Sequence, residues 1–170
     1  MKKSNIIMIV TLIMFLLTIP TILFVTPHYS ILGYRVSLSD TIICCILIIN
    51  CLYCGMLSGI LLAVITPVIS FVLTSSASIT QKPLLLVCLM VGNAILVLGA
   101  WLVRGKKIEL NVLPITLVVA SIAKYAVVTL LLTYWLNTKH SYSMAQLYEA
   151  LLATFFVCIA WPLLKLIVKR

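Results

Sequence analysis

Residues 41–81 read TIICCILIINCLYCGMLSGILLAVITPVISFVLTSSASITQ, and this stretch contains no Asp, Glu, Lys or Arg. As one continuous α-helix it would be about 60 Å long, whereas the hydrocarbon core of a bilayer is roughly 30 Å thick. The stretch is therefore predicted to fold back on itself as two membrane helices. We expect the turn at Tyr53-Cys54-Gly55, because glycine permits the tight backbone of a reversal.

The composition of the whole chain also indicates a membrane protein. Of the 170 residues, 64% are hydrophobic and 9% are charged, and the mean hydropathy is +1.29. This leaves too little polar surface to enclose a water-soluble core. The formal net charge is +9, but the basic residues gather at the ends of apolar runs and form no basic stripe with interleaved aromatics. Nucleic acid is therefore not an expected partner.

Six apolar segments are candidate membrane spans, since about 20 apolar residues of helix cross the hydrocarbon core. They are residues 6–24, 38–53, 55–73, 84–103, 112–136 and 147–168. Pro83 and Pro114 lie near predicted helix starts, whereas Pro67 and Pro162 fall inside spans, where kinks are expected. No internal repeat or linker is present. The predicted fold class is an all-α membrane protein, in which residues 1–170 form a single domain with six transmembrane helices.

The distribution of basic residues predicts that both termini are cytoplasmic. In that orientation eight Lys and Arg residues lie inside: Lys2, Lys3, Arg104, Lys106, Lys107, Lys165, Lys169 and Arg170. Three lie outside: Arg35, Lys82 and Lys139. This asymmetry follows the positive-inside rule. The two lysines at the start also resemble the beginning of a signal peptide, but no small-residue cleavage pattern follows, so a retained helix is expected.

Lys124 is the only charged residue in the apolar run from residue 110 to 137. A cation at bilayer depth costs roughly 2.5–3.5 kcal/mol on insertion scales, so it normally faces a protein interior or a wet cavity. Asn93 lies near the middle of the preceding span, at a similar membrane level, and is the expected partner. Its amide oxygen can accept from the ammonium, and together they can hold a carboxylate or a polar ring. Substrate contact, structural polar pairing and ion or proton coupling all remain open.

Two sets of small residues each leave alternatives open. A stripe with a period of four residues is expected to line a cavity or to form a packing seam: Thr116, Ala120 and Lys124. A second set, on span 55–73, favours close helix packing over a partner-binding face: Gly55, Ser58, Gly59 and Ala63.

Asp40 and Glu149 are placed in the first turns of their predicted spans. A negative charge there meets the helix dipole favourably, so capping is one role for them. The other is that both rim an outward-facing pocket. The polar loop 26–37, which carries Tyr34, would roof that pocket, and a second polar loop, residues 74–82, would form part of the same lid.

The remaining motifs give no evidence of catalysis or of a metal site. Six cysteines lie within or beside apolar spans, where Cys behaves as a small hydrophobic residue. Cys51-x-x-Cys54 has no second ligand pair or nearby His to complete a zinc site, so packing is its expected role. No catalytic set of Ser, His and acid is apparent, and no metal or cofactor is predicted. The chain has no Walker-type phosphate loop, so any ATP hydrolysis would occur on other chains.

Several short stretches resemble the substrate-binding S components of energy-coupling factor (ECF) vitamin transporters. They are GMLSGILLAVITPVISFVL at residues 55–73, a polar loop ending in QKP at 81–83, VCLMVGNAILVLGAWLVRGKK at 87–107, and SIAKYAVV at 121–128. The positions that match are Gly59, Pro67, Gly92, Asn93 and Ala94, together with the helix around Lys124. In that family the S component captures a micronutrient from outside and is then toppled by a membrane T component and two cytoplasmic ATPases.

The resemblance implies a multi-pass subunit of a bacterial plasma membrane, surrounded by lipid, that binds a vitamin-like molecule under its first and third outer loops. The candidate substrate-binding residues are Asn93, Lys124, Asp40, Tyr34, Gln81 and Glu149. A lone interior cation, with no interior anion, favours a carboxylate-bearing ligand such as pantothenate, nicotinate or a folate. The first helix departs from the family, because residues 5–17 lack the Ala-x-x-x-Ala face that docks the T component. The small-residue face of span 55–73 is a possible substitute.

Two other classes of function stay open. A non-transporting six-helix scaffold, similar to the MreD cell-shape family, would also explain the bundle, and its Lys124 would be structural. The second class is a membrane enzyme. The chain is not expected to be an enzyme, because its sequence shows no catalytic set. Stabilisation by a ligand separates a binding subunit from a scaffold.

Overall fold

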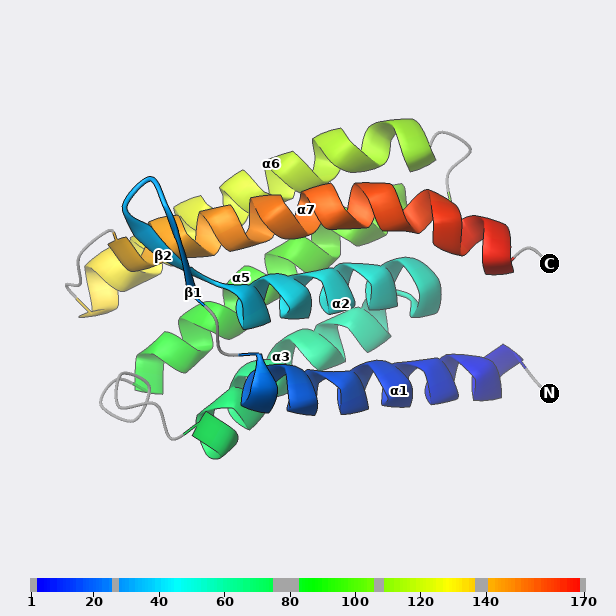
Figure 1. The fold of residues 1–170 in the computed structure, drawn as a ribbon, viewed down its shortest axis with the longest axis horizontal. Helices are drawn as coiled ribbons and strands as arrows, with labels where there is room; N and C mark the ends of the chain where they lie inside the picture. The colour runs from blue at the N-terminus through cyan, green and yellow to red at the C-terminus, as the bar shows by residue number, and fades with distance from the viewer. Residues whose placement is uncertain (1–2, 26–27, 75–82, 106–108, 137–140, 169–170) are drawn as a thin grey trace.

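The structure, a computed structural model, describes residues 3–25, 28–74, 83–105, 109–136 and 141–168 (Figure 1). Its elements are α1 (Lys3–Phe24), β1 (His28–Ile31), β2 (Tyr34–Ser37), α2 (Leu38–Cys54), α3 (Met56–Thr74), α5 (Pro83–Val103), α6 (Glu109–Leu131), the π-helix η1 (Leu132–Leu136) and α7 (Ser141–Val168). Among the described residues, five helices are long and apolar enough to cross a membrane, and α2 is a shorter apolar helix. The chain is therefore a multi-pass helical membrane protein, as predicted.

The turn between α2 and α3 lies where the sequence predicts it. Gly55 has a φ of 113°, and its N–H donates to the carbonyl of Cys51 at 2.9 Å. Arg104, just after α5, closes the same helix end: its Nε donates to the carbonyl of Leu52 at 2.9 Å and its Nη2 to that of Tyr53 at 3.0 Å. A cation that bonds the last carbonyls of a helix stabilises that end.

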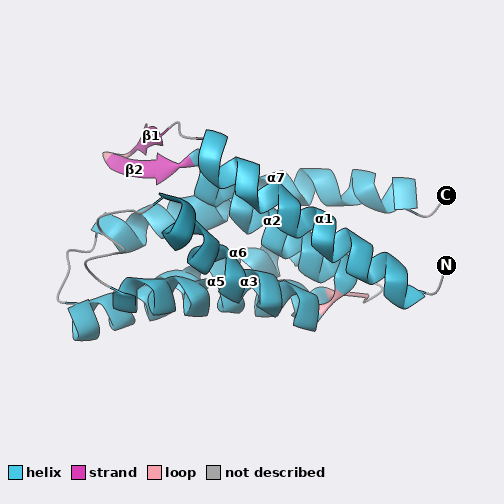
Figure 2. Ribbon diagram, turned by 90° about the horizontal axis from the view of Figure 1, so that it is seen from below, coloured by secondary structure: helices cyan, strands magenta, loops and turns pink. Residues whose placement is uncertain are grey.

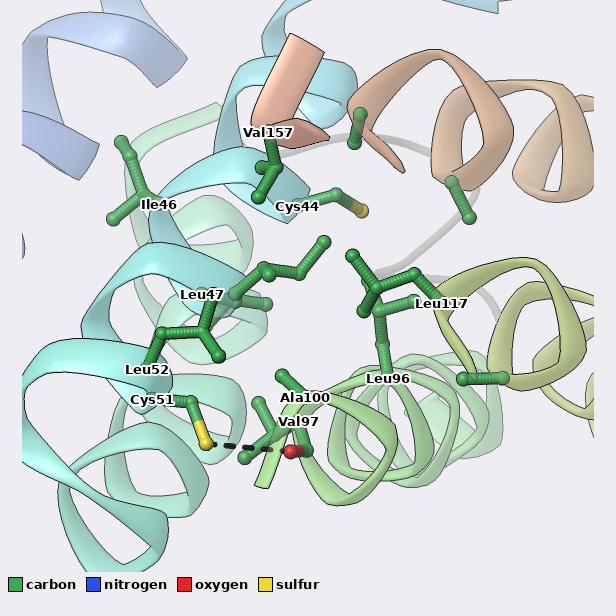
Figure 3. Packing of buried hydrophobic residues seen from close by; sticks show 14 of the residues in the cluster. Cys44, Ile46, Leu47, Cys51, Leu52, Leu96, Val97, Ala100, Leu117 and Val157 are labelled. Carbon is green, nitrogen blue, oxygen red and sulfur yellow. Dashed lines mark hydrogen bonds between the residues drawn. The ribbon is translucent and has the colours of Figure 1, made fainter. Parts of the chain in front are cut away.

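The short helix α2 forms the centre of the bundle. Its 17 residues measure about 25 Å, less than the hydrocarbon thickness. It packs against α1, α3, α5 and α7, and more than half of its residues are buried. Figure 3 shows Leu47 and Cys51 of α2 among Leu96 and Val97 of α5 and Val157 of α7, with the Cys51 thiol donating to the Val97 carbonyl at 3.3 Å. Because other helices surround it, α2 is a buried core helix.

The segment predicted as a polar loop at residues 26–37 is, in its described part, a β-hairpin. β1 and β2 pair antiparallel, and the turn residues Leu32 and Gly33 have φ values of 50° and 83°. Positive φ at both positions is the geometry of a type I′ turn, whose twist matches that of a hairpin. Val36 is only 1% exposed, so the hairpin packs on the bundle through one face. The prediction of an entirely α-helical fold is therefore wrong at this segment.

The hairpin and the chain ends mark opposite ends of the bundle. The first residues of α1 and the last of α7 lie at one end, and the hairpin lies at the other, above the start of α7 (Figures 1 and 2). The end of α3, the start of α5 and the start of α7 also lie at the hairpin end (Figure 1).

Two helix starts differ from the predicted spans. α6 begins at Glu109, so Pro114 is inside the helix and not in its first turn. α7 begins at Ser141, six residues before the predicted start at 147. Hydropathy misses this segment because its polar side chains are buried inside the bundle: Ser143 and Gln146 are 0% and 4% exposed.

Close contact between α5 and α6 depends on Gly92 and Gly99. A Cβ added at Gly99 would collide with the Cβ of Ala120 on α6. A Cβ at Gly92 would lie 3.3 Å from Cγ of Lys124. The stripe predicted on α6 is therefore a packing seam at Ala120, and Lys124 lies one turn further along the same seam.

The small residues of α3 also face the interior. A Cβ at Gly59 would lie 2.7 Å from Cγ1 of Val97 on α5. The Ser58 hydroxyl accepts from Nδ2 of Asn50 at 2.8 Å and lies 2.7 Å from the hydroxyl of Thr11 on α1. Close packing within the bundle is confirmed. This face of α3 is covered, so it is not a substitute docking face for a partner.

Candidate functional site

Lys124 is 0% exposed, although it carries the only charge in its helix beyond the first residue. Its ammonium donates to Oδ1 of Asn93 on α5 at 3.2 Å and to Sγ of Cys44 on α2 at 3.5 Å. The predicted contact with Asn93 is confirmed, and Cys44 is a partner that sequence reasoning missed. The aliphatic stem lies over Gly92, where the missing side chain leaves room for it. One buried cation thus joins α2, α5 and α6.

A cavity of about 40 Å³ lies beside this ammonium. Its polar lining comes from five helices: Asp40, Thr66, Ser70, Asn93, Lys124 and Gln146. A polar cavity needs only about 10–15 Å³ to hold a water molecule, whereas pockets for drug-sized ligands measure roughly 300–1,000 Å³. In this conformation the cavity accommodates water or a small chemical group and not a whole vitamin.

Asp40 lies in the first turn of α2 and lines the cavity. Its backbone N–H donates to Oγ of Ser37, the N-cap residue, at 3.3 Å. The helix end is thus capped by a serine side chain. Asp40 and Lys124 are the acid and the base among the residues that line the cavity. Asp40 therefore occupies both of the places considered for it, at a helix start and at a pocket.

Glu149 is not at a helix start, because α7 begins eight residues before it. It is 2% exposed, and its carboxylate accepts two hydrogen bonds. Oε1 accepts from the backbone N–H of Ser37 at 3.0 Å, and Oε2 accepts from Nε2 of Gln146 at 2.7 Å. Glu149 therefore fastens the end of the hairpin to α7. The prediction that it caps its own helix is wrong, and Gln146, one turn earlier, is the α7 residue that lines the cavity.

The other two predicted residues lie elsewhere. Tyr34 is in β2, and its ring centroid is 5.9 Å from that of Tyr148 on α7. It packs the hairpin onto α7 and is not among the residues that line the cavity. Gln81 lies outside the described residues, as does most of the polar loop that contains it. The structure therefore brings together Asn93, Lys124 and Asp40, with Glu149 close by.

Several cavity residues were missed at the sequence level. Thr66 and Ser70 line the cavity from α3, on either side of Pro67. Their spacing of four residues, on one face of an apolar helix, was the available signal. Gln146 was missed because it falls before the predicted start of its span.

The charge around the cavity differs from what the sequence suggests. We expected a lone interior cation without an interior anion. In the structure Asp40 lines the cavity with Lys124, and Glu149 is buried next to it, where it accepts a hydrogen bond from the cavity-lining Gln146. The premise that favoured a simple carboxylate ligand therefore fails.

The cysteines are placed as packing residues with weak polar contacts. Three thiols donate to carbonyls of neighbouring helices: Cys45 to Ala153 at 3.7 Å, Cys51 to Val97 at 3.3 Å, and Cys54 to Ile7 at 3.8 Å. Within the described part of the chain, no group of three or more His, Cys, Asp and Glu residues could hold a metal ion.

No family model, no curated protein and no solved structure matches this chain. Function is therefore inferred from the cavity, from the hairpin beside it and from the short motifs that resemble ECF S components.

Proposed function

We propose that this chain is the substrate-specific membrane subunit of an ECF-type importer, and that it captures a vitamin or related micronutrient from outside the cell. The observation that carries the proposal is a polar cavity with a buried, paired lysine inside a bundle whose core is mainly apolar. Ionisable residues at membrane depth are rare because they are costly, and they normally mark a binding or transport site. The motifs that resemble ECF S components include Asn93 and the helix around Lys124.

The position of the cavity agrees with capture from outside. Its residues include Asp40 in the first turn of α2 and Gln146 in the second turn of α7, so it lies toward the hairpin end of the bundle. The basic residues favour a cytoplasmic location for the opposite end, where both chain ends lie. In this proposal all six helices cross a bacterial plasma membrane, and α2 crosses it as an enclosed helix.

Binding of a whole vitamin requires the cavity to open. The hairpin is held to α7 by two described contacts, the Ser37–Glu149 hydrogen bond and the ring contact between Tyr34 and Tyr148. Movement of the hairpin away from α7 would break these contacts and expose Val36, which is buried against the bundle. In the proposed mechanism the hairpin closes over the ligand. A T component and two ATPase subunits then drive uptake, since this chain has no phosphate-binding loop of its own.

A second candidate is the non-transporting scaffold similar to the MreD family. One observation favours it: Lys124 already has two internal partners, and the cavity is small. In a scaffold those contacts would be the whole role of the lysine.

Thermal unfolding of the detergent-purified protein separates the two candidates. The probes are riboflavin, thiamine, biotin, pantothenate, nicotinate and folate, each at a saturating concentration. A bound probe at 100 times its Kd stabilises the folded state by about 2.7 kcal/mol. A rise in the unfolding temperature with one of these probes supports the importer subunit. No rise with any of them would reject it in favour of the scaffold.

The role of Lys124 is tested by calorimetry with the probe that binds. Lys124→Ala should weaken binding at least about 30-fold, because removing one partner of a desolvated charged contact costs roughly 2–5 kcal/mol. Lys124→Arg should not restore it fully, since the guanidinium is larger and directs its hydrogens differently. Lys165→Ala, at the other end of the bundle, is the control. Unchanged affinity in folded Lys124→Ala would make the lysine structural.

A further inference from the structure

The cavity presents groups of opposite charge from different helices. Lys124 approaches it from α6, and Asp40 approaches it from α2. The two hydrogen bonds of the ammonium described above go to Asn93 and Cys44, and neither goes to Asp40. Within the described part of the chain these are the hydrogen bonds of the ammonium, which leaves one of its three hydrogens for a ligand. The cation and the anion share the cavity without being each other's hydrogen-bond partners.

The surroundings do not make the cavity electropositive. Among the described residues, its lining contains one acid, Asp40, and one base, Lys124. A ligand with only a carboxylate would bind Lys124 and leave Asp40 without a partner. A ligand with only a cation would bind Asp40 and be repelled by Lys124. A ligand that carries both kinds of group satisfies each side of the cavity.

We propose that the ligand of this cavity is dipolar: a basic or N–H-rich nitrogen meets Asp40, and a carboxylate or carbonyl oxygen meets Lys124 and Asn93. This inference rests on the proposed function and defines its substrate class. Thr66, Ser70 and Gln146 add neutral polar groups to the lining. The cavity of about 40 Å³ holds one small polar group in this conformation, and the rest of the ligand is admitted when the hairpin opens.

The test compares pairs of compounds that share a skeleton and differ in a donor nitrogen. The pairs are propionate with β-alanine, butyrate with 4-aminobutyrate, and benzoate with 4-aminobenzoate. Affinities are measured by calorimetry on the full-length protein in detergent. In a pair that binds, we expect the nitrogen-bearing member to bind at least about tenfold tighter, the ratio that one hydrogen bond to a charged group supplies.

Substitution of Asp40 then shows whether that carboxylate is the cause. Asp40→Asn should reduce the preference within the pair to about threefold or less, because the amide cannot balance a positive charge. Glu109→Gln makes the same chemical change at the first residue of α6, which does not line the cavity. It should keep the preference. The wild-type comparison needs no variant, so it decides the question even if Asp40→Asn fails to fold.

The outcomes separate this inference from the proposed function. Equal or tighter binding of the plain carboxylates would overturn the dipolar ligand and leave the importer subunit standing. Equal loss of preference in Glu109→Gln and Asp40→Asn would overturn the assignment to Asp40. If none of the six compounds binds while a vitamin does, the dipolar inference fails alone. If no vitamin binds either, the proposed function fails with it.

Discussion

The helix packing that positions Lys124 can be tested by moving one methyl group from α6 to α5, with the substitutions Gly99→Ala and Ala120→Gly. In Gly99→Ala the new Cβ meets the Cβ of Ala120 within contact distance. That atom is attached directly to the backbone of α6, so it cannot rotate away and the helices must separate. Overpacking of this kind costs about 1–3 kcal/mol, and replacing glycine by alanine in a helix returns about 1 kcal/mol. We expect Gly99→Ala to be destabilised by about 0–2 kcal/mol.

Moving the methyl group to the other helix should restore stability. Ala120→Gly alone should cost about 1 kcal/mol in helix propensity, and more if the small cavity does not close. In the double variant Gly99→Ala/Ala120→Gly the interface again holds one methyl group, and the two propensity changes cancel. It should therefore unfold close to the wild type. The coupling free energy between the two positions is expected to be about 2 kcal/mol.

The buried thiols provide the assay. Cys44, Cys51 and Cys88 are almost wholly buried, so a thiol-reactive fluorescent dye reports unfolding during heating in detergent. The midpoints are compared at one heating rate, because unfolding of this kind is often irreversible. Ala126→Gly, on the exposed side of α6, measures the propensity cost without the packing. A double variant as unstable as the sum of its single changes would refute the close approach of α5 and α6 at this point.

Three further predictions concern the turns. Gly55→Ala should lower the unfolding midpoint, by about 1–3 kcal/mol of stability, because φ is +113° and the new Cβ would lie 3.2 Å from Nη1 of Arg104. Leu32→Gly should slow amide hydrogen exchange in the hairpin, since a leucine at φ 50° carries about 1–2 kcal/mol of strain; faster exchange would contradict the type I′ turn. A cysteine at Gly33, in the hairpin, or at Gly105, after α5, has open space around its side chain. An impermeant maleimide applied to intact cells should label Gly33→Cys and not Gly105→Cys. Labelling of Gly105→Cys would reverse the proposed orientation.

The helices could be predicted from the sequence because charge and hydropathy constrain them directly. A 41-residue stretch without charge cannot remain one helix in a bilayer, and the φ of Gly55 confirms the turn that this argument requires. The hairpin could not be predicted in the same way. Its turn residues, Leu32 and Gly33, are not the Asn-Gly or Asp-Gly pair that usually marks a type I′ turn. Packing of Val36 against the bundle stabilises a turn that local sequence preference disfavours.

The sequence predicted those site residues whose depth in the membrane could be estimated from their helical spans. Asn93 and Lys124 lie near the middle of long apolar spans, where an error of a few residues at either end changes little. Glu149 lay at the start of a predicted span, so its position depended entirely on where that span began. Extending α7 back to Ser141 moves Glu149 from the first turn to the third and into the interior. An estimate from hydropathy fails at such a boundary, because buried polar residues there resemble a loop.

The two sides of the cavity are attached to different parts of the fold. Lys124 and Asn93 lie on α6 and α5, which Gly92 and Gly99 hold in close contact. Asp40 lies three residues after the hairpin, and the residue that caps its helix also bonds Glu149 through its backbone. A movement of the hairpin therefore acts on the acidic side of the cavity and leaves the cationic side in place. In the proposed importer subunit, contact between the ligand nitrogen and Asp40 is thus the interaction that couples occupancy of the cavity to the position of the hairpin.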